Sequence, residues 1–331
     1  MSNHGEREEL ERFLRQNSLR LENDIEYSFA LYDRERMVAT GSFSGNVLKC
    51  IAVDSQYEGM GLAVKVLSRL VIEEFVRGRT HLFIYTKPEN TGIFKELGFY
   101  EISRVPFKVV LMENTPDGIS GFAMQLRKHK NPGRVVGSIV INANPFTKGH
   151  KYLVEKASAE CDWLHIFIVW EDRSVFPSEV RYSLVKEGTK HLKNVTVHKG
   201  KDYIISNATF PTYFLKKPDE AVKVQSMLDI QIFREHIAPA LGINRRYVGE
   251  EPYCPVTVIY NQSMKEMLPS CGIEVFEVPR KRLGSHAISA SRVRDLLREG
   301  ELNLVKEMVP DTTFAFLNSG DALSILVKIG N

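Results

Sequence analysis

The sequence predicts an α/β protein with two domains, an α+β domain over residues 1–128 and a parallel-sheet domain over residues 134–331. Three observations support this division. The chain has 331 residues, which exceeds one average domain. Closely spaced strands dominate the first part, whereas strands alternate with helices in the second. Between the two parts lies the polar stretch KHKNPGR, residues 128–134, whose Pro-Gly pair is typical of a linker.

Composition and charge argue against several classes of protein. Hydrophobic residues make up 43% and charged residues 26% of the chain, which is ordinary for a soluble globular protein. The net charge of +3 is too small to predict binding to nucleic acid or to an anionic membrane. The first residues are charged, unlike a signal peptide, and the longest apolar run, near residues 164–170, is too short to span a bilayer. We therefore expect a cytoplasmic protein with four reduced cysteines and no nucleic-acid or membrane partner.

The first domain begins with an amphipathic helix over residues 6–21, which places Leu10, Phe13 and Leu14 on one face. Short polar turns then separate three strands, so an antiparallel meander is expected. The predicted strands of the whole domain cover residues 27–32, 37–42, 47–53, 81–86, 107–112 and 121–126.

A glycine motif follows the third strand, which ends at Val53. It reads Gln56-x-x-Gly59-x-Gly61 and leads into a helix that runs to Val76. Glycine has no side chain, so the backbone can approach a bound group closely. The free N–H groups at the start of the helix favour an anion at the same place. The motif therefore predicts a phosphate-binding loop, although glycine pairs before helices are often only turns.

The order of motifs in this domain resembles the GCN5-related N-acetyltransferase family over about residues 1–125. The resemblance is carried by the Gln56–Gly61 loop and by Leu97-Gly98-Phe99 after the strand at 81–86. It implies that Val53, Gln56, Gly59 and Gly61 bind a CoA-like arm. Tyr100 and Glu101 are nearby candidates for the general base of amine acetylation, but each is more often structural. The domain can therefore bind such an arm without acetylating an amine.

The second domain opens with a run of β-branched residues at 135–141, which is too apolar to alternate and predicts a strand buried on both faces. Further strands are expected at 163–170, 195–197, 246–248 and 274–278. Helices are expected after Pro177 and over residues 218–241, 256–268 and 291–298. This alternation predicts a parallel sheet with helices on both faces.

The opening strand runs into a polar loop and then a helix. The loop residues are Asn142, Asn144, Pro145, Thr147 and Gly149. The first N–H groups of such a helix have no helical partner, and the helix dipole adds partial positive charge. A junction of this kind binds phosphates, and Thr147 and His150 lie where they could face one.

A second candidate site is the stretch Ile288-Ser289-Ala290-Ser291-Arg292-Val293-Arg294, which leads into the last predicted helix. Ser289 or Ser291 would serve as an N-cap, which is a purely structural role. A hydroxyl pair with an arginine at a helix start also suits a polyphosphate, because the guanidinium forks onto its oxygens. Both interpretations remain open from the residues alone.

Together these two stretches resemble the paired signatures of the nucleotidyltransferase superfamily, His/Thr-x-Gly-His and Ile-Ser-Ser-Thr-x-x-Arg. Thr147 and His150 match the first signature, and Ser289, Ser291 and Arg294 match the second, with departures at positions 290 and 291. The resemblance implies a Rossmann-like nucleotidyltransferase domain that binds ATP.

Nearly the whole chain resembles the citrate lyase ligase family. The stretches that carry this resemblance are residues 144–150, residues 201–206 with 208–211, and Gly249-Glu250-Glu251-Pro252. It implies an AMP-forming acid-thiol ligase, in which ATP and acetate form acetyl-adenylate. The acetyl group then passes to the thiol of a CoA-like prosthetic group on the acyl carrier subunit of citrate lyase. Mg²⁺ is expected as a companion of ATP, although no carboxylate identifies itself as its ligand.

The resemblance also implies roles for individual residues. His150, Thr147 and Arg294 are the expected catalytic residues, with His150 and Thr147 on the α-phosphate and Arg294 on the leaving pyrophosphate. The other residues expected to bind ATP are Asn142, Asn144, Phe146, Lys148, Gly149, Arg173, Ser289 and Ser291. Arg173 and Lys148 are the weaker candidates, because each is more often a solvated surface residue.

Three alternatives to this interpretation remain. The chain could be an adenylyltransferase of coenzyme synthesis, of the phosphopantetheine type, fused to an acetyltransferase. It could be a protein N-acetyltransferase whose second half is only structural. It could also be a nucleotide-sensing protein that binds ATP without turnover.

Overall fold

The computed structural model describes residues 4–171, 173–210, 220–284 and 286–330. Contacts divide the chain into two compact units, Met1–Gly118 and Ile119–Asn331, and each unit has a hydrophobic core of its own. The predicted α/β fold class is confirmed, since each unit contains its own sheet with helices packed on it. Within the described residues, no helix combines the length and the apolar composition that crossing a membrane requires.

The sheet of the first unit has six strands in the order β1-β2-β3-β4-β6-β5. These strands are β1 (Tyr27–Asp33), β2 (Arg36–Ser44), β3 (Val47–Val53), β4 (Phe83–Thr86), β5 (Tyr100–Val105) and β6 (Val109–Glu113). The first three pair antiparallel, which confirms the predicted meander. β3 and β4 pair in parallel, and β5 lies outside the predicted strands.

The helices of the first unit pack through two separate apolar clusters. The helices of this unit are α1 (His4–Gln16), η1 (Ser55–Tyr57), α2 (Leu62–Val76), η2 (Pro88–Asn90) and α3 (Thr91–Glu96). Helix α1 buries the predicted face of Leu10, Phe13 and Leu14 in one cluster. Helix α2 buries Val66, Leu67 and Leu70 in the other, and this burial fixes the helix that follows the glycine loop.

The prediction of a strand at 121–126 is wrong, because the structure has helix α4 (Gly118–Arg127) there. Ile119, Phe122, Ala123 and Leu126 are buried, and their spacing of three and four residues is helical. The ring of Phe122 stacks on Tyr203 with centroids 5.2 Å apart. Residues 119–128 therefore belong to the second unit by their contacts, which moves the division between units ahead of the predicted boundary.

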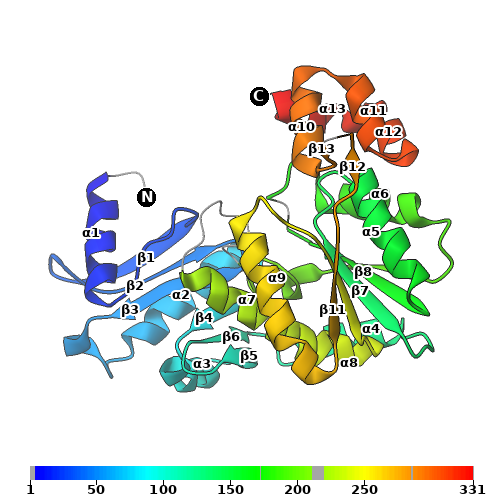
Figure 1. Cartoon of the computed structure of the whole chain (residues 1–331). Coiled ribbons are helices and arrows are strands. Elements are labelled where there is room, and N and C mark those ends of the chain that lie inside the picture. Colours follow the sequence, from blue (N-terminus) through cyan, green and yellow to red (C-terminus); the bar gives the residue numbers. More distant parts are fainter. Residues whose placement is uncertain (1–3, 172, 211–219, 285, 331) are drawn as a thin grey trace. The chain divides into compact units, whose positions relative to one another are not determined.

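The sheet of the second unit has five strands in the order β11-β10-β7-β8-β9, of which Figure 1 labels β7, β8 and β11. They are β7 (Val136–Ile141), β8 (Trp163–Ile168), β9 (Val195–Lys199), β10 (Arg245–Gly249) and β11 (Glu274–Val278). All neighbouring pairs are parallel, as predicted. From β7 the chain adds β8 and β9 on one side of the sheet, and it later adds β10 and β11 on the other side. The carboxyl ends of β7 and β10 therefore flank a topological switch point, where such sheets bind ligands.

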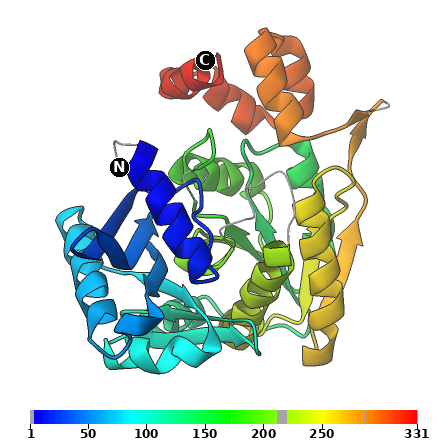
Figure 2. The same cartoon turned by 90° about the vertical axis from the view of Figure 1, so that its left-hand side faces the viewer.

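Helices cover both faces of this sheet and extend beyond one end of it. Those that precede β11 are α5 (Lys148–Ala159), α6 (Ser178–Thr189), η3 (Lys201–Tyr203), α7 (Glu220–Ile232), η5 (Phe233–Ile237), α8 (Ala238–Leu241), α9 (Pro255–Met267) and η6 (Pro269–Cys271). Helices α7 and α9 run side by side (Figure 2). The predicted helix at 218–241 corresponds to α7, the π-helical η5 and α8 in succession, and its first two residues lie outside the described part of the chain.

The last part of the chain forms a small hairpin and a group of helices. The hairpin pairs β12 (Arg282–Leu283) with β13 (His286–Ala287). The helices are α10 (Ala290–Glu299), α11 (Leu302–Met308), α12 (Asp311–Leu317), η7 (Gly320–Ala322) and α13 (Leu323–Gly330). In Figure 1 this group, drawn in orange and red, lies together at one end of the second unit. Only α10 is among the predicted elements.

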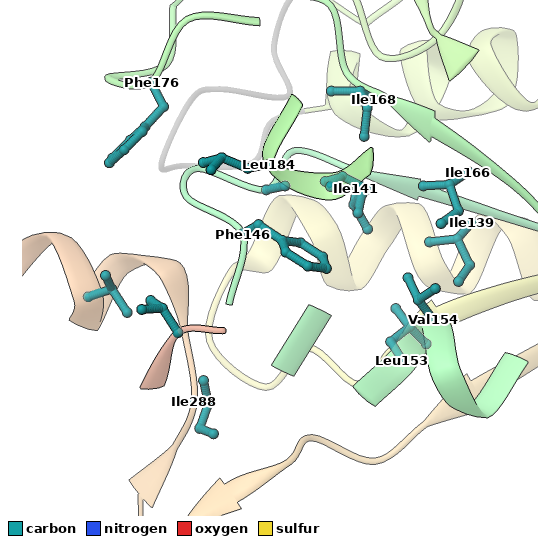
Figure 3. Packing of buried hydrophobic residues seen from close by; sticks show 14 of the residues in the cluster. Ile139, Ile141, Phe146, Leu153, Val154, Ile166, Ile168, Phe176, Leu184 and Ile288 are labelled. Atoms are coloured by element: carbon teal, nitrogen blue, oxygen red, sulfur yellow. The ribbon is translucent and has the colours of Figure 1, made fainter. Parts of the chain in front are cut away.

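The main core of the second unit lies between the sheet, helices α5 and α6, and the C-terminal helices. Phe146 and Phe176 are fully buried in it, and Ile288 joins it from the segment before α10. Figure 3 shows Phe146 among the aliphatic side chains of this cluster. The loop after β7 is therefore fixed to the core by the side chain of Phe146.

Candidate functional site

A cavity of about 780 Å³ opens at the carboxyl ends of β7 and β10. Both predicted phosphate-binding segments contribute to its wall. The predicted residues that line it are Asn142, Asn144, Thr147, Gly149, His150, Ser289, Ser291 and Arg294. Segments that are far apart in sequence thus meet at one site, and this site is the switch point of the sheet.

Thr147 and His150 are locked together at the start of α5. Thr147 is the N-cap, and its Oγ1 accepts a hydrogen bond from the backbone N–H of His150 at 3.3 Å. In return, the backbone N–H of Thr147 donates to Nδ1 of His150 at 3.1 Å. This reciprocal pattern is a capping box with histidine in the place usually taken by a glutamate or glutamine.

The same contacts fix the protonation of His150. Because Nδ1 accepts from the backbone, the proton of the neutral imidazole lies on Nε2. Burial, with the positive charge of Arg280, lowers the pKa of His150 to about 4. The ring also lies parallel to that of Phe146, with centroids 6.0 Å apart. His150 is therefore an oriented, neutral donor at neutral pH.

Gly149 is the point at which the two segments touch. A Cβ placed on Gly149 would lie 3.1 Å from the carbonyl oxygen of Ile288 and 3.4 Å from Oγ1 of Thr147. The missing side chain thus allows the start of α5 to approach the strand-like segment before α10. The close approach brings the two helix N-termini to the same cavity.

Ser289, Ser291 and Arg294 have different roles at the start of α10. Ser289 is the N-cap, and its Oγ accepts from the backbone N–H of Arg292 at 3.1 Å, so its structural role is realised. Arg294 donates from Nη2 to Oγ of Ser291 at 3.2 Å and from Nη1 to the carbonyl oxygen of Asn144 at 2.5 Å. Burial lowers the pKa of Arg294 from its ordinary value, yet arginine stays charged at any physiological pH.

Arg181 is a residue that the sequence did not single out for this site. It is fully buried on α6, and it donates to acceptors in the segments that follow β7 and β8. Nη1 donates to Asn142 at both its carbonyl oxygen (2.9 Å) and Oδ1 (2.8 Å) and to the carbonyl oxygen of Val169 (2.5 Å). Nη2 and Nε donate to the carbonyl oxygens of Glu171 (2.7 Å) and Phe176 (2.9 Å). An arginine in a helix carries no sequence signal for such a role.

The side chains of Asn142 and Asn144 hold the neighbouring loop. Asn142 exchanges hydrogen bonds with Oγ of Ser174 at 3.1 and 3.2 Å. Oδ1 of Asn144 accepts from the backbone N–H of Phe176 at 3.0 Å, and its peptide bond to Pro145 is cis. Both asparagines line the cavity, so their amide groups hold the loop that forms part of its wall.

Three residues expected to bind ATP are placed elsewhere. Phe146 is fully buried in the core, since its ring packs against Gly188 beneath the loop. Lys148 donates from Nζ to the carbonyl oxygen of Lys306 at 3.2 Å. Arg173 donates from Nη2 to Oδ1 of Asn207 at 2.8 Å. Within the described residues, all three lie outside the lining of the cavity, and of the three only Phe146 stacks on a ring that lines it, that of His150.

The loop after β10 forms another wall, which the sequence marked only by family resemblance. Oε1 of Glu251 accepts from the backbone N–H groups of Tyr253 (3.0 Å) and Cys254 (3.1 Å). Oε2 of Glu251 accepts from Nη2 of Arg280 at 2.5 Å, and that guanidinium lies 5.3 Å from the ring centroid of Tyr253. Arg280 therefore joins the ends of β10 and β11 and adds positive charge to the cavity.

The glycine loop of the first unit has the expected local structure. Gly59 and Gly61 have φ values of 77° and 71°, and Gly61 is the N-cap of α2. The loop is fixed by Asp54, whose Oδ1 accepts from the backbone N–H of Gln56 at 2.9 Å. Oε1 of Gln56 accepts from Nη1 of Arg36 at 3.3 Å. Val53 precedes the loop as the last residue of β3.

Glu101, one of the two candidate bases of the first unit, is poorly suited to that role. Glu101 lies on β5 and is paired with Arg104 on the same strand. The Arg104 guanidinium holds the pKa of Glu101 below its ordinary value, so this carboxylate is a poor proton acceptor.

The described residues contain no group of three or more His, Cys, Asp or Glu side chains arranged to hold a metal ion. Of the two glutamates in the wall of the cavity, Glu251 is committed to Arg280 and to backbone N–H groups. A divalent cation at this site would therefore be held chiefly by the phosphates of a nucleotide and by water, as is usual for Mg²⁺.

Comparison with known proteins gives consistent matches over this chain. A family model described as the citrate lyase ligase C-terminal domain matches residues 136–317. The citrate (pro-3S)-lyase ligase of Klebsiella pneumoniae is 45% identical over 315 residues, which covers 94% of this chain and 92% of that protein. The proteins of the same name from Haemophilus influenzae and Escherichia coli (strain K12) are 45% and 42% identical over 316 residues. The aligned residues cover 93% of this chain and 94% of the Haemophilus influenzae protein. For the Escherichia coli protein they cover 94% of this chain and 90% of that protein.

Proposed function

The chain belongs to the citrate lyase ligase family, and from this premise we propose that its cavity binds ATP and activates acetate. An oxygen of acetate attacks the α-phosphorus of ATP, the bond from that phosphorus to the bridging oxygen breaks, and pyrophosphate leaves. The thiolate sulfur of the CoA-like group on the acyl carrier subunit of citrate lyase then attacks the acyl carbon of acetyl-adenylate. AMP leaves, the thiol proton passes to solvent, and the acetyl thioester activates citrate lyase.

The observation that carries this proposal is the meeting of the two signature segments in one cavity. Gly149 lies against Ile288, Arg294 bonds to Asn144, and the N-termini of α5 and α10 both line the same wall. Two helix N-termini and one guanidinium provide the donors and the positive charge that a chain of phosphates requires. A volume of about 780 Å³ leaves room for a second small substrate beside a nucleotide.

We assign His150 to the α-phosphate. Negative charge builds on its oxygens as acetate attacks, and a preorganised donor lowers the barrier when it already points at that charge. Nε2–H of the neutral ring supplies this donor, while Nδ1 is held by the backbone of Thr147. Thr147 thus acts as a positioning residue as well as the N-cap of a phosphate-binding helix.

We assign Arg294 and Ser291 to the β- and γ-phosphates and to the leaving pyrophosphate. The guanidinium is oriented by its bond to Asn144, so it need not reorganise when the phosphates bind. Ser289 supports the same group through the N-terminus of α10, which its side chain caps. Mg²⁺ is expected to accompany ATP and to neutralise part of the phosphate charge.

We assign the thiol step to the first unit. The loop of Gln56, Gly59 and Gly61 at the start of α2 has the open backbone that a pyrophosphate arm requires. Its role is to hold the CoA-like group of the carrier, and not to acetylate an amine. All four cysteines are free thiols, which fits the proposed cytoplasmic location.

The experiment that tests this function uses the chain with ATP, acetate and the thiol form of citrate lyase. We expect recovery of lyase activity with AMP and pyrophosphate formed in step. Recovery without ATP, or with ADP as the product, would contradict an adenylate route. An N-acetyltransferase with a structural second half predicts activity without ATP that survives His150→Ala.

A further inference from the structure

The lining of the cavity also includes a floor formed by β10, by helix α9 and by the segment after η3. The residues that line this floor are Ile205, Arg246, Val248, Tyr260 and Met264. All are buried, and most are apolar. The floor is therefore mostly apolar, whereas the phosphate-binding rim of the same cavity is polar.

Arg246 is the positively charged residue of this floor. Only 2% of it is exposed, and its guanidinium carbon lies 4.8 Å from the ring centroid of Phe233. It lies beside Asp229 of α7, which is also buried. Burial raises the pKa of Asp229, while hydrogen bonds to it and the positive charge of Arg246 act in the opposite direction.

Asp229 in turn is tightly held. Its Oδ1 accepts from Oγ1 of Thr209 (2.6 Å) and from the backbone N–H of Ile205 (2.7 Å), and its Oδ2 accepts from the hydroxyl of Tyr260 (2.7 Å). Two of the floor residues are therefore fixed by the carboxylate that stabilises the charge of Arg246. The guanidinium lies near this carboxylate in a region of low dielectric, where opposite charges attract strongly.

The proposed reaction requires a second anion beside ATP. Acetate carries one carboxylate and one methyl group, and it must reach the α-phosphorus from the side opposite to the leaving pyrophosphate. The rim already supplies Arg294 and two helix N-termini for the phosphates. A buried arginine among apolar side chains offers a planar fork for the carboxylate and a non-polar surface for the methyl group.

We propose that Arg246 binds the carboxylate of the acid substrate and that Val248 and Met264 enclose its methyl group. This proposal rests on the proposed function and adds the position at which the acid binds. One carboxylate oxygen stays on the guanidinium while the other attacks the α-phosphorus and forms the new phosphorus–oxygen bond. Met264 limits the length of the chain that the floor accepts.

The first test measures exchange of labelled pyrophosphate into ATP, which reports reversible formation of the acyl-adenylate. In Arg246→Met the KM for acetate should rise roughly tenfold to hundredfold, while the KM for ATP changes by less than about twofold. Arg246→Lys keeps the charge and should recover part of the loss. Arg245→Met is the matched control, because Arg245 is the neighbouring residue on β10 and lies outside the cavity lining.

A second variant decides the question if Arg246→Met does not fold. In Met264→Ala the ratio of kcat/KM for propanoate to that for acetate should rise roughly tenfold, since one extra methylene then fits the floor. Val258→Ala, on the exposed side of α9, is its control. An unchanged acetate KM in folded Arg246→Met, or an unchanged ratio in Met264→Ala, would overturn the assignment.

Failure of this assignment and failure of the proposed function give different results. If exchange by the unmodified chain requires acetate while both variants behave like it, the acid binds elsewhere and the ligase function stands. If exchange by the unmodified chain ignores acetate, the proposed function itself is wrong and the assignment falls with it.

Discussion

Arg294 donates from Nη1 to the carbonyl oxygen of Asn144 at 2.5 Å, across 150 residues of chain. One residue lies on α10 and the other just after the end of β7. The bond joins the C-terminal helices to the loop after the central strand and leaves the guanidinium at the wall of the cavity. The site is therefore complete only when residues 286–294 are folded onto the loop after β7.

Replacement of Arg294 should impair the adenylation step itself. In Arg294→Lys we expect kcat for pyrophosphate exchange to fall roughly a hundredfold, because an ammonium retains charge but loses the fork that spans Asn144 and the phosphates. Steady-state exchange kinetics measure this. Arg292→Lys, on the same helix but paired with Glu299, should stay near the unmodified rate. Equal effects of the two substitutions would argue against a role in catalysis.

His150→Ala removes the proposed donor to the α-phosphate. We expect kcat for exchange to fall roughly a hundredfold to a thousandfold, with a smaller change in the KM for ATP. The exposed His191, which pairs with Glu155 on the surface, provides the control His191→Ala. Turnover that survives His150→Ala would favour the acetyltransferase alternative.

The buried Arg181 should be important for stability. Arg181→Met leaves the carbonyl oxygens of Asn142, Val169, Glu171 and Phe176 without this donor. The free energy of unfolding should fall by roughly 3 to 5 kcal/mol, as measured by urea denaturation. Lys190→Met, at the exposed end of α6, should change it by less than about 0.5 kcal/mol. If Arg181→Met lowers the free energy of unfolding no more than Lys190→Met does, the stabilising role of Arg181 is refuted.

Stability should also decline in mild acid because two histidines are buried as a pair. Nδ1 of His165 and Nε2 of His198 are 2.9 Å apart on neighbouring strands. Burial lowers the pKa of His165 to about 4 and that of His198 to about 3. The unfolded chain, with histidine pKa values near 6.5, therefore binds more protons between about pH 6.5 and 4. The free energy of unfolding then rises with pH over this window, so the protein loses stability as the pH falls through it.

The expected loss is about 2 kcal/mol per buried histidine between pH 6.5 and 5. Urea denaturation at a series of pH values measures it. In His198→Gln the dependence on pH should be shallower, whereas His191→Gln, at an exposed site, should leave it unchanged. A slope that is the same in all three proteins would show that these histidines are not its source.

The glycine loop of the first unit should affect only the thiol step. Gly61→Ala forces a side chain onto a residue with φ of 71° at the N-terminus of α2, which strains the loop by roughly 1 to 2 kcal/mol. The KM for the thiol form of citrate lyase should rise, while acetate-dependent exchange stays unchanged. Gly78→Ala is a matched control, because Gly78 has φ of 78° at the other end of the same helix. A parallel loss of exchange in Gly61→Ala would contradict this assignment.

The sequence predicted the features that depend on local pattern. The β-branched run before Asn142 became the central strand β7, and Ser289, one of the two predicted N-cap candidates, caps α10. These features follow from burial and from backbone hydrogen bonding within a few residues, so the local sequence suffices.

Features that depend on distant contacts could not be predicted in this way. Phe146 belongs to a signature loop, yet its ring fills the core beneath Gly188. Arg181 and Arg246 resemble surface residues in the sequence and are buried only because helices and strands from elsewhere in the chain cover them. Helix α4 shows the limit of a short window, since Phe122, Ala123 and Leu126 of the predicted strand form one buried helical face together with Ile119.

The measurement that tests the central claim most directly is exchange of labelled pyrophosphate into ATP by this chain alone, with and without acetate. No thiol substrate is added, so the assay isolates the step assigned to the cavity of His150 and Arg294. We predict exchange that requires acetate and saturates with it. Exchange that ignores acetate and responds to phosphopantetheine would contradict it and identify an adenylyltransferase of coenzyme synthesis instead.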